Sequence, residues 1–385
     1  MRILVFLHSF EAGGVERVAL RLAGEWSAAG HDVRVAIGRN EGPQREIAPE
    51  HVTYDFAPPS VLARPFETLW LVWQTIGAIR RHRPDVLFCA GCTYVVVAGL
   101  VRLLMRGQCP PIVAKLSNSL ERRDLWWPAR AGYRLWLRAH PLIVERVVGM
   151  APPMHDEIRR HLRIPTERIA IIPDPALNCD DLRELATSPV RHSAGRKFIA
   201  VGRLTRQKNF TLLLRAFATM ATVDDRLVIL GEGPWRKKLN RLARRLGVAA
   251  RVDMPGHVRS VAELLTASDV FVSSSLYEGL PSVIVEALAA GLPIVATDCS
   301  ACMGYLLGSG SLGQIVPVRD VGALAEAMRE APRREELPIA AMRKAAEEFT
   351  LERSAGIYLE LLAATAATRP TILNSLMKQQ PPHAA

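Results

Sequence analysis

Short apolar runs alternate with helix-patterned segments along most of this chain, and this alternation restricts its fold more than any other feature. Residues 2–7, 31–37, 85–89 and 112–116 are rich in β-branched and other apolar side chains, as buried strands are. Residues 15–29 instead repeat their apolar side chains at helical spacing. Strands that alternate with helices are joined by crossover connections and are therefore parallel. The sequence predicts an α/β fold with doubly wound parallel sheets.

The length of the chain predicts more than one domain. Its 385 residues are too many for one ordinary core and fit two domains of similar size. Residues 176–196 lose periodicity and gain Pro, Ser, Asp and Gly, which indicates a linker. We therefore expect an N-terminal domain over 1–175 and a C-terminal domain over 197–353. A helix-patterned segment, 354–367, comes next, and 368–385 is typical of a loose tail.

Composition and charge narrow the classes of partner. A hydrophobic content of 49% with 23% charged residues indicates a folded protein with an ample core. A net charge of +11 suggests nucleotide phosphates, nucleic acid or an anionic membrane face as partners. No run reaches the roughly 18 to 20 apolar residues of a spanning helix. The short apolar run at 3–7 leads into His8 and is not a signal peptide, so we expect a cytoplasmic protein.

The cysteines do not predict a metal centre. Two C-x-x-C pairs occur, Cys89/Cys92 and Cys299/Cys302, and they lie more than 200 residues apart. Zinc ribbons place about 15 to 20 residues between such pairs. We therefore interpret the cysteines as reduced core thiols and predict no structural metal.

Two carboxylates, Glu278 and Glu286, flank the start of one predicted helix. Residues 269–275 form a β-branched run that ends in three serines, typical of a parallel strand reaching its carboxyl end. Residues 279–282 suit the first turn of the next helix. Ligands of such sheets bind at this edge, where unpaired helix N–H groups favour anions. A phosphate site at 279–282 is one interpretation; the ordinary alternative is that both acids are solvated.

A second loop at a strand end carries two cations. Residues 197–203 are patterned as a strand, and Arg203 and Lys208 follow before the helix that begins near Asn209. Two cations on one loop suit a pyrophosphate, because charge-assisted hydrogen bonds to phosphate are strong where water is partly excluded. A single Arg or Lys would more simply be an exposed surface charge.

These motifs carry a family resemblance. Residues 278–297, EGLPSVIVEALAAGLPIVAT, resemble the Glu-x7-Glu signature of the family 4 retaining glycosyltransferases. Residues 202–209, GRLTRQKN, match the G-R-L-x-x-x-K-N pattern of the same family, and the Gly-Gly-Val-Glu loop at 13–16 also recurs there. The resemblance covers nearly the whole chain and is strongest over 198–297. It implies the GT-B fold, in which two Rossmann-like domains face each other across a cleft and the last helix, here 354–367, returns to the first domain.

The resemblance also implies roles for individual residues. Glu278 would contact the donor hexose, Glu286 the nucleotide ribose, and Arg203 and Lys208 the donor diphosphate, with Glu278, Arg203 and Lys208 as the catalytic residues. The expected donor-binding set is Gly14, Arg203, Lys208, His257, Val258, Glu278, Gly279, Leu280, Pro281 and Glu286. The expected acceptor-side set is Gly13, Glu16 and Asn118. Many relatives have a His near the position of Asn118.

The function implied is transfer of a hexose, with retention, from a nucleotide diphosphate sugar to an acceptor hydroxyl. The acceptor would be a lipid-linked saccharide of bacterial polysaccharide or glycolipid biosynthesis. No Asp-x-Asp pair occurs, so we expect no cofactor and no obligatory metal at the phosphates. A GT-B epimerase or phosphorylase is one alternative. A basic membrane- or nucleic-acid-binding module without catalysis is another. No G-x-G-x-x-G follows the first strand, which disfavours a nicotinamide dehydrogenase.

Two segments mix aromatic residues with arginines. They are 65–83 and 125–146, and the second interleaves Trp126, Trp127 and Trp136 with Arg130, Arg134 and Arg138. Such helices suit a membrane interface, where rings lie at headgroup depth and guanidinium groups meet lipid phosphate. The alternative is an aromatic core beneath a solvated basic face. For the second segment we favour the membrane, which predicts a peripheral protein on the inner face of the cytoplasmic membrane.

Overall fold

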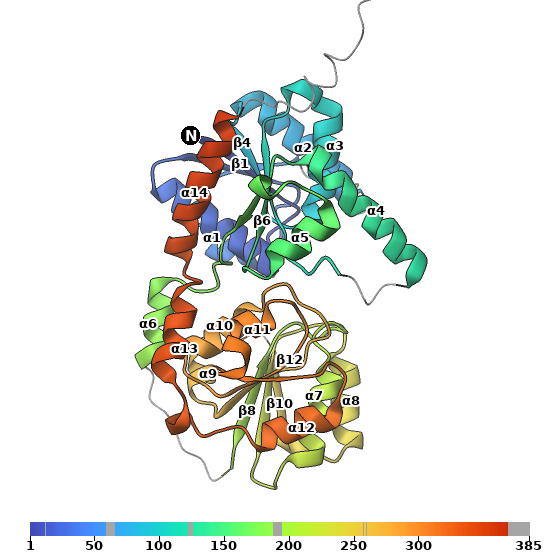
Figure 1. Ribbon diagram of the computed structural model, residues 1–385, viewed down its shortest axis with the longest axis vertical. Coiled ribbons are helices and arrows are strands. Elements are labelled where there is room, and N and C mark those ends of the chain that lie inside the picture. Colours follow the sequence, from blue (N-terminus) through green and yellow to red (C-terminus); the bar gives the residue numbers. More distant parts are fainter. Residues whose placement is uncertain are drawn as a thin grey trace, which may run out of the picture. The chain divides into compact units, whose positions relative to one another are not determined.

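The chain divides into two compact units. The computed structural model describes residues 1–11, 13–58, 66–121, 126–187, 195–256, 258 and 260–368. Unit 1 comprises Met1–Pro173 together with the segment from Leu351 onward, and unit 2 comprises Asp174–Thr350. Each unit contains one parallel sheet with helices packed on it (Figure 1). The expected α/β fold with two Rossmann-like domains is confirmed.

Unit 1 is built on a seven-stranded sheet with the order β3-β2-β1-β4-β5-β6-β7. Its strands are β1 (Arg2–Leu7), β2 (Asp32–Ile37), β3 (Thr53–Phe56), β4 (Val86–Cys89), β5 (Ile112–Lys115), β6 (Arg146–Gly149) and β7 (Ile169–Ile171). Its helices are α1 (Gly14–Ala28), α2 (Glu67–His82), α3 (Val95–Met105), α4 (Trp127–Ile143), α5 (Met154–Leu162) and α14 (Leu351–Ala367). The central strands are buried on both faces, which explains their nearly continuous apolar sequences.

Helix α14 packs on unit 1 through aromatic contacts. The Trp26 indole N–H on α1 donates to the Ala355 carbonyl on α14 at 3.2 Å. Tyr358 on α14 lies edge-on to Trp26 and to Phe88 of β4, with ring centroids 6.0 and 5.4 Å apart. Figure 1 shows α1 and α14 beside each other. The chain therefore contributes its first helix and its last described helix to the same unit.

Unit 2 is built on a six-stranded parallel sheet with the order β10-β9-β8-β11-β12-β13. Its strands are β8 (Lys197–Val201), β9 (Arg226–Leu230), β10 (Val252–Gly256), β11 (Val270–Ser273), β12 (Ile294–Thr297) and β13 (Gln314–Val316). Its helices are α6 (Cys179–Thr187), α7 (Phe210–Met220), α8 (Arg236–Arg245), α9 (Val261–Thr266), α10 (Ser282–Ala289), α11 (Met303–Leu306), α12 (Val321–Arg329) and α13 (Ile339–Glu347). Helix α6 lies within 176–196, where the sequence predicted a linker without periodicity.

Both sheets have a topological switch point, the place where the strand order reverses. In unit 1 the chain runs from β1 outward to β2 and β3 and then returns to β4 on the other side of β1. In unit 2 it runs from β8 to β9 and β10 and returns to β11. Ligands of open α/β sheets bind at the carboxyl ends of the strands at such points. We therefore expect a ligand at the switch point of each sheet.

Candidate active site

Two loops at the switch point of unit 2 are hydrogen bonded to each other. One follows β8 and the other follows β11, its neighbour in the sheet. The Leu276 amide donates to the Gln207 carbonyl at 2.8 Å, and the Ser274 hydroxyl donates to the Lys208 carbonyl at 2.9 Å. The two regions in which the sequence predicted phosphate contacts are therefore adjacent.

Glu278 lies in the middle of these loops with three side-chain partners. Its Oε1 is 2.7 Å from the Lys208 Nζ and accepts from the Ser275 hydroxyl at 2.7 Å. Its Oε2 accepts from the Gln207 amide at 3.2 Å. Glu278 is only 7% exposed, and a carboxylate so deeply buried must be paired and hydrogen bonded. The structure thus joins Glu278, the residue predicted to contact the hexose, and Lys208, one of the two residues predicted to contact the diphosphate, in an ion pair.

The Lys208 side chain passes close to Gly202, where there is no room for a larger residue. Gly202, the residue directly after β8, has φ +154°, and a Cβ there would lie 2.8 Å from the Lys208 Cε. A larger residue would strain the backbone and displace the lysine. Arg203 follows directly and is exposed. Of the two residues predicted to contact the diphosphate, Lys208 is therefore held in place, and Arg203 faces solvent.

The next segment leads into helix α10. Gly279, Leu280 and Pro281 are buried, and α10 begins at Ser282 without a side-chain cap from Pro281. The N–H groups of a first turn have no partner within the helix and favour anions. Glu286 is half-buried on the same helix. The start of α10 thus lies directly after the Glu278 loop, and a phosphate at this position stays a prediction.

The other predicted site residues are distributed over both units. Val258 is half-buried and follows β10, the edge strand of the unit 2 sheet. His257 lies outside the described residues. Asn118 is exposed and follows β5 in unit 1. Of Val258 and Asn118, Val258 lies in the same unit as the Lys208–Glu278 cluster.

The cysteines are thiols in this structure. All six are free, and Cys299 lies beside the cluster, where its carbonyl accepts from the Glu278 amide at 3.1 Å. Burial raises the pKa of the Cys299 thiol, and the nearby Glu278 carboxylate raises it further. Within the described ranges, no group of three or more His, Cys, Asp or Glu side chains is placed to hold a metal ion.

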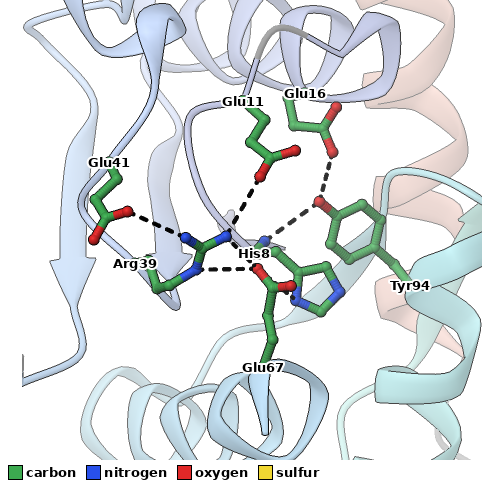
Figure 2. Close-up of polar contacts among 7 residues, drawn as sticks. All are labelled: His8, Glu11, Glu16, Arg39, Glu41, Glu67 and Tyr94. Atoms are coloured by element: carbon green, nitrogen blue, oxygen red, sulfur yellow. Dashed lines mark hydrogen bonds and ion pairs between the residues drawn. The ribbon is translucent and has the colours of Figure 1, made fainter. Parts of the chain in front are cut away.

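A second polar cluster occupies the switch point of unit 1 (Figure 2). The Tyr94 hydroxyl donates to the Glu16 Oε1 at 2.8 Å and accepts from the His8 amide at 3.3 Å. The His8 and Tyr94 rings are stacked, with centroids 4.9 Å apart. Arg39 donates to the Glu67 Oε1 at 2.8 Å. Of the predicted acceptor-side residues, Glu16 belongs to this cluster.

Gly13 and Gly14 differ sharply in the space around them, which yields a paired prediction. A Cβ at Gly13 would lie 1.8 Å from the Glu16 Oε2, whereas one at Gly14 meets nothing within 4 Å. Gly13→Ala should therefore push Glu16 from Tyr94 and lower the free energy of unfolding by about 1 to 2 kcal/mol. Gly14→Ala should leave it unchanged or raise it slightly. Urea unfolding of both variants checks this, and equal effects would contradict it.

Six residues of the two clusters as described above were not predicted: Gln207, Ser275, His8, Tyr94, Arg39 and Glu67. Gln207 is an unspecified position of the G-R-L-x-x-x-K-N pattern, and Ser275 is the last of three consecutive serines, the first of which ends β11. His8 was interpreted only as the end of the first strand. A polar residue within two positions of the end of a buried parallel strand is the signal that could have identified Ser275 and His8.

Two protein families match complementary parts of the chain. Residues 12–175 match the family described as Glycosyltransferase Family 4. Residues 186–349 match the family described as Glycosyl transferases group 1. The first match lies almost entirely in unit 1 and the second in unit 2.

Individual relatives are similar over part or all of the chain. An uncharacterized glycosyltransferase of Methanocaldococcus jannaschii is 33% identical over 61% of this chain and 61% of its own length. N-acetylgalactosamine-N,N'-diacetylbacillosaminyl-diphospho-undecaprenol 4-alpha-N-acetylgalactosaminyltransferase of Campylobacter jejuni is 33% identical over 34% of this chain and 36% of its own length. These alignments span less than two thirds of either relative. Anabaena HepE, solved in complex with UDP-glucose, shares the fold with a TM-score of 0.66 and 17% identity, over 98% of this chain and 100% of that one.

Proposed function

Because the chain belongs to the GT-B glycosyltransferases of the family 4 type, we propose that it transfers a hexose, with retention, from a nucleotide diphosphate sugar to an acceptor hydroxyl. The observation that carries this proposal is the buried Lys208–Glu278 pair at the unit 2 switch point. This pair places a cation for the diphosphate, Lys208, and a carboxylate for the hexose hydroxyls, Glu278, within a single cluster. The solved complex of HepE with UDP-glucose supports a nucleotide sugar as the donor class.

The chemical difficulty is the leaving diphosphate, whose negative charge grows as the glycosidic bond breaks. Lys208 and the first turn of α10 provide positive potential that is in place before the reaction, which is the most effective form of electrostatic catalysis. Arg203 adds a second cation from an exposed position. Lys208 is held by Glu278 and by its own backbone contact with Ser274. It therefore needs little reorganisation to face a phosphate.

Glu278 is suited to orient the hexose and unsuited to attack it. Its carboxylate already receives hydrogen bonds from Ser275 and Gln207 and pairs with Lys208. These contacts stabilise the charge and lower its nucleophilicity. Retention then follows from attack by the acceptor on the side of the leaving group, with no covalent sugar on Glu278.

The donor is tested by thermal unfolding against a panel of UDP, GDP, dTDP and ADP sugars. A ligand that binds only the folded state raises its stability, by about 2.7 kcal/mol at a hundred times Kd. We expect one nucleotide class to raise the Tm clearly above the others. No shift with any of them would contradict the donor assignment.

Glu286→Ala should weaken the binding of the free nucleotide and of the nucleotide sugar equally. The reason is that ribose hydroxyls, the proposed partners of Glu286, are present in both ligands. Loss of a charged hydrogen bond costs about 1.5 to 3 kcal/mol, or roughly 10- to 150-fold in Kd. Titration calorimetry measures the Kd of both ligands, and an unchanged Kd in Glu286→Ala would exclude the ribose contact.

Glu278→Ala is the matched comparison. It should reduce turnover more than it reduces the affinity for the nucleotide.

A lipid-linked acceptor is the second part of the proposal. The Campylobacter relative is named for a diphospho-undecaprenol acceptor. In unit 1, α2, α3 and α4 carry large apolar side chains in solvent; these are Leu69, Trp73, Val96, Leu103, Leu104, Trp127, Leu135 and Leu142, with Phe66 and Trp126 just ahead of α2 and α4. Trp73, Trp126 and Trp127 are 56, 71 and 80% exposed, so the alternative of an aromatic core does not hold for them. Over the described residues, none of the helices combines the length and apolar character of a membrane span.

We therefore expect unit 1 to dock on an anionic membrane surface. At about 1 kcal/mol per basic residue, reversal of Arg130, Arg134 and Arg138 to Glu should weaken binding to anionic vesicles at least about hundredfold. Co-sedimentation with anionic and neutral vesicles measures this. The matched control reverses Arg241, Arg244 and Arg245, which are exposed on α8 of unit 2. Equal recovery on neutral vesicles, or equal loss in the control, would contradict docking through α4.

A further inference from the structure

The two switch points carry clusters of different charge and chemistry. That of unit 2 pairs a lysine with Glu278. In unit 1, His8 is the residue directly after β1, and Tyr94 ends the turn that follows β4, the strand paired with β1 on the other side of the reversal. Glu16 lies in the first turn of α1. The position that favours a ligand in unit 1 is therefore lined by His8 and Glu16.

Tyr94 fixes both of these side chains. It is 1% exposed, its ring stacks on His8 at an interplanar angle of 27°, and its hydroxyl donates to Glu16. Figure 2 shows Tyr94 beside His8, with its hydroxyl directed at Glu16. A phenol held this firmly limits the movement of both neighbours. Preorganisation of this kind is typical of binding sites, because it reduces the entropy lost when a ligand binds.

His8 has the properties of an uncharged hydrogen-bonding group. Burial lowers its pKa, although the Glu67 and Glu16 carboxylates oppose this. Its Nδ1 is buried without a hydrogen-bond partner in the described part of the chain, and the Glu67 Oε1 is 4.0 Å away. The side chain remains 21% exposed. A neutral imidazole offers one donor and one acceptor, which suits a sugar hydroxyl.

The surroundings of His8 carry negative charge. Arg39 contacts Glu67, Glu11 and Glu41 at 2.8 to 3.4 Å, so its single positive charge is shared among three carboxylates, and Glu16 adds a fourth. An anionic group at this position would be repelled, whereas hydroxyl and amino groups can donate to carboxylates. The cluster thus selects by charge as well as by hydrogen bonding.

We propose that His8 and Glu16 bind hydroxyl groups of the acceptor, and that the acceptor sugar bound there is neutral or amino-substituted and not a uronic acid. This inference rests on the proposed transferase function, because it assigns the acceptor of that reaction. His8 acts as a binding and positioning residue. Any phosphate of a lipid-linked acceptor must therefore lie away from this cluster.

Saturation-transfer NMR measures the binding of sugars to the protein and does not require glycosyl transfer. The result therefore does not depend on whether the proposed reaction is observed. The probes are methyl β-glucoside, methyl β-galactoside and methyl N-acetyl-β-glucosaminide, with methyl β-glucuronide as the anionic counterpart. They are added to the full-length protein and to four variants. His8→Phe keeps the stacking on Tyr94 and removes both nitrogens, and His8→Gln keeps one donor and one acceptor. His155→Phe is a surface control in the same unit, and Glu278→Gln reports on the hexose site of unit 2.

We expect at least one neutral glycoside to show saturation of its ring protons and the glucuronide to show none. Affinity should fall about tenfold in His8→Phe, be partly restored in His8→Gln, and remain unchanged in His155→Phe and Glu278→Gln. Three results would overturn the assignment to His8: wild-type affinity in His8→Phe, loss of the signal in Glu278→Gln instead, or no neutral probe bound by the wild type. Glucuronide binding equal to that of the glucoside would overturn the charge selection.

Discussion

Lys208→Ala is expected to lower kcat for glycosyl transfer by about 10²- to 10³-fold. The change removes a cation that faces the leaving diphosphate in the proposed reaction, where charge develops in the transition state. It also leaves Glu278, which is 7% exposed, without its ion-pair partner. Because the affected interaction grows in the transition state, kcat should fall more than donor affinity. Steady-state release of the nucleotide diphosphate measures both.

Two further variants separate the charge of Lys208 from general damage to the loop. Arg206 is exposed on the same loop, and Arg206→Ala should keep nearly full activity. Glu278→Gln retains the volume of the side chain and one acceptor oxygen but removes the charge that pairs with Lys208, so kcat should fall while the affinity for the nucleotide changes little. Wild-type kcat in Lys208→Ala would refute the diphosphate role.

Glu145→Ala should destabilise unit 1 by about 3 to 5 kcal/mol, the usual cost of breaking a buried ion pair from one side. The Arg102 Nη2 donates to both Glu145 oxygens at 2.6 and 2.7 Å, and the Ile112 amide donates to Oε2 at 2.6 Å. The Arg102 and Glu145 side chains are 10 and 12% exposed. The variant thus leaves a guanidinium and an amide buried without these partners.

Asp180→Ala provides the contrast for that prediction. Asp180 pairs with Arg183 at 2.8 Å, but both side chains are more than 70% exposed, and exposed pairs contribute little to stability. Urea unfolding should therefore show a large change in midpoint for Glu145→Ala and almost none for Asp180→Ala. Similar midpoints for the two variants would mean that the Arg102–Glu145 pair is not a main support of unit 1.

Much of the fold could be predicted from the sequence because its central strands are short and strongly apolar. The predicted strands 2–7 and 112–116 differ from β1 and β5 by at most one residue. Strands β3, β6 and β7 of unit 1 and β13 of unit 2 were missed. β3 and β7 lie at the edges of the sheet, where burial is incomplete and the apolar signal is weaker. β6 follows the Arg-rich helix α4 directly, so its apolar residues merged with the helical pattern.

The candidate site could be predicted from the sequence only in part. The motifs indicated Glu278 and Lys208 as residues of interest, because each follows a strand with the right loop chemistry. Their pairing was not predictable, since it depends on β8 and β11 lying side by side, and the order of strands in a parallel sheet is a tertiary property. The same applies to His8 and Tyr94, which are 86 residues apart in the chain.

The anomeric configuration of the first sugar released tests the central claim most directly. The wild-type protein would be given the nucleotide sugar that stabilises it most, with water as the acceptor, and proton NMR would follow the anomeric signal before mutarotation. We predict that the α-linked donor first yields the α-anomer, and that Lys208→Ala slows this release. First formation of the β-anomer, or no release of the nucleotide diphosphate with any donor, would contradict retaining transfer at the Lys208–Glu278 site.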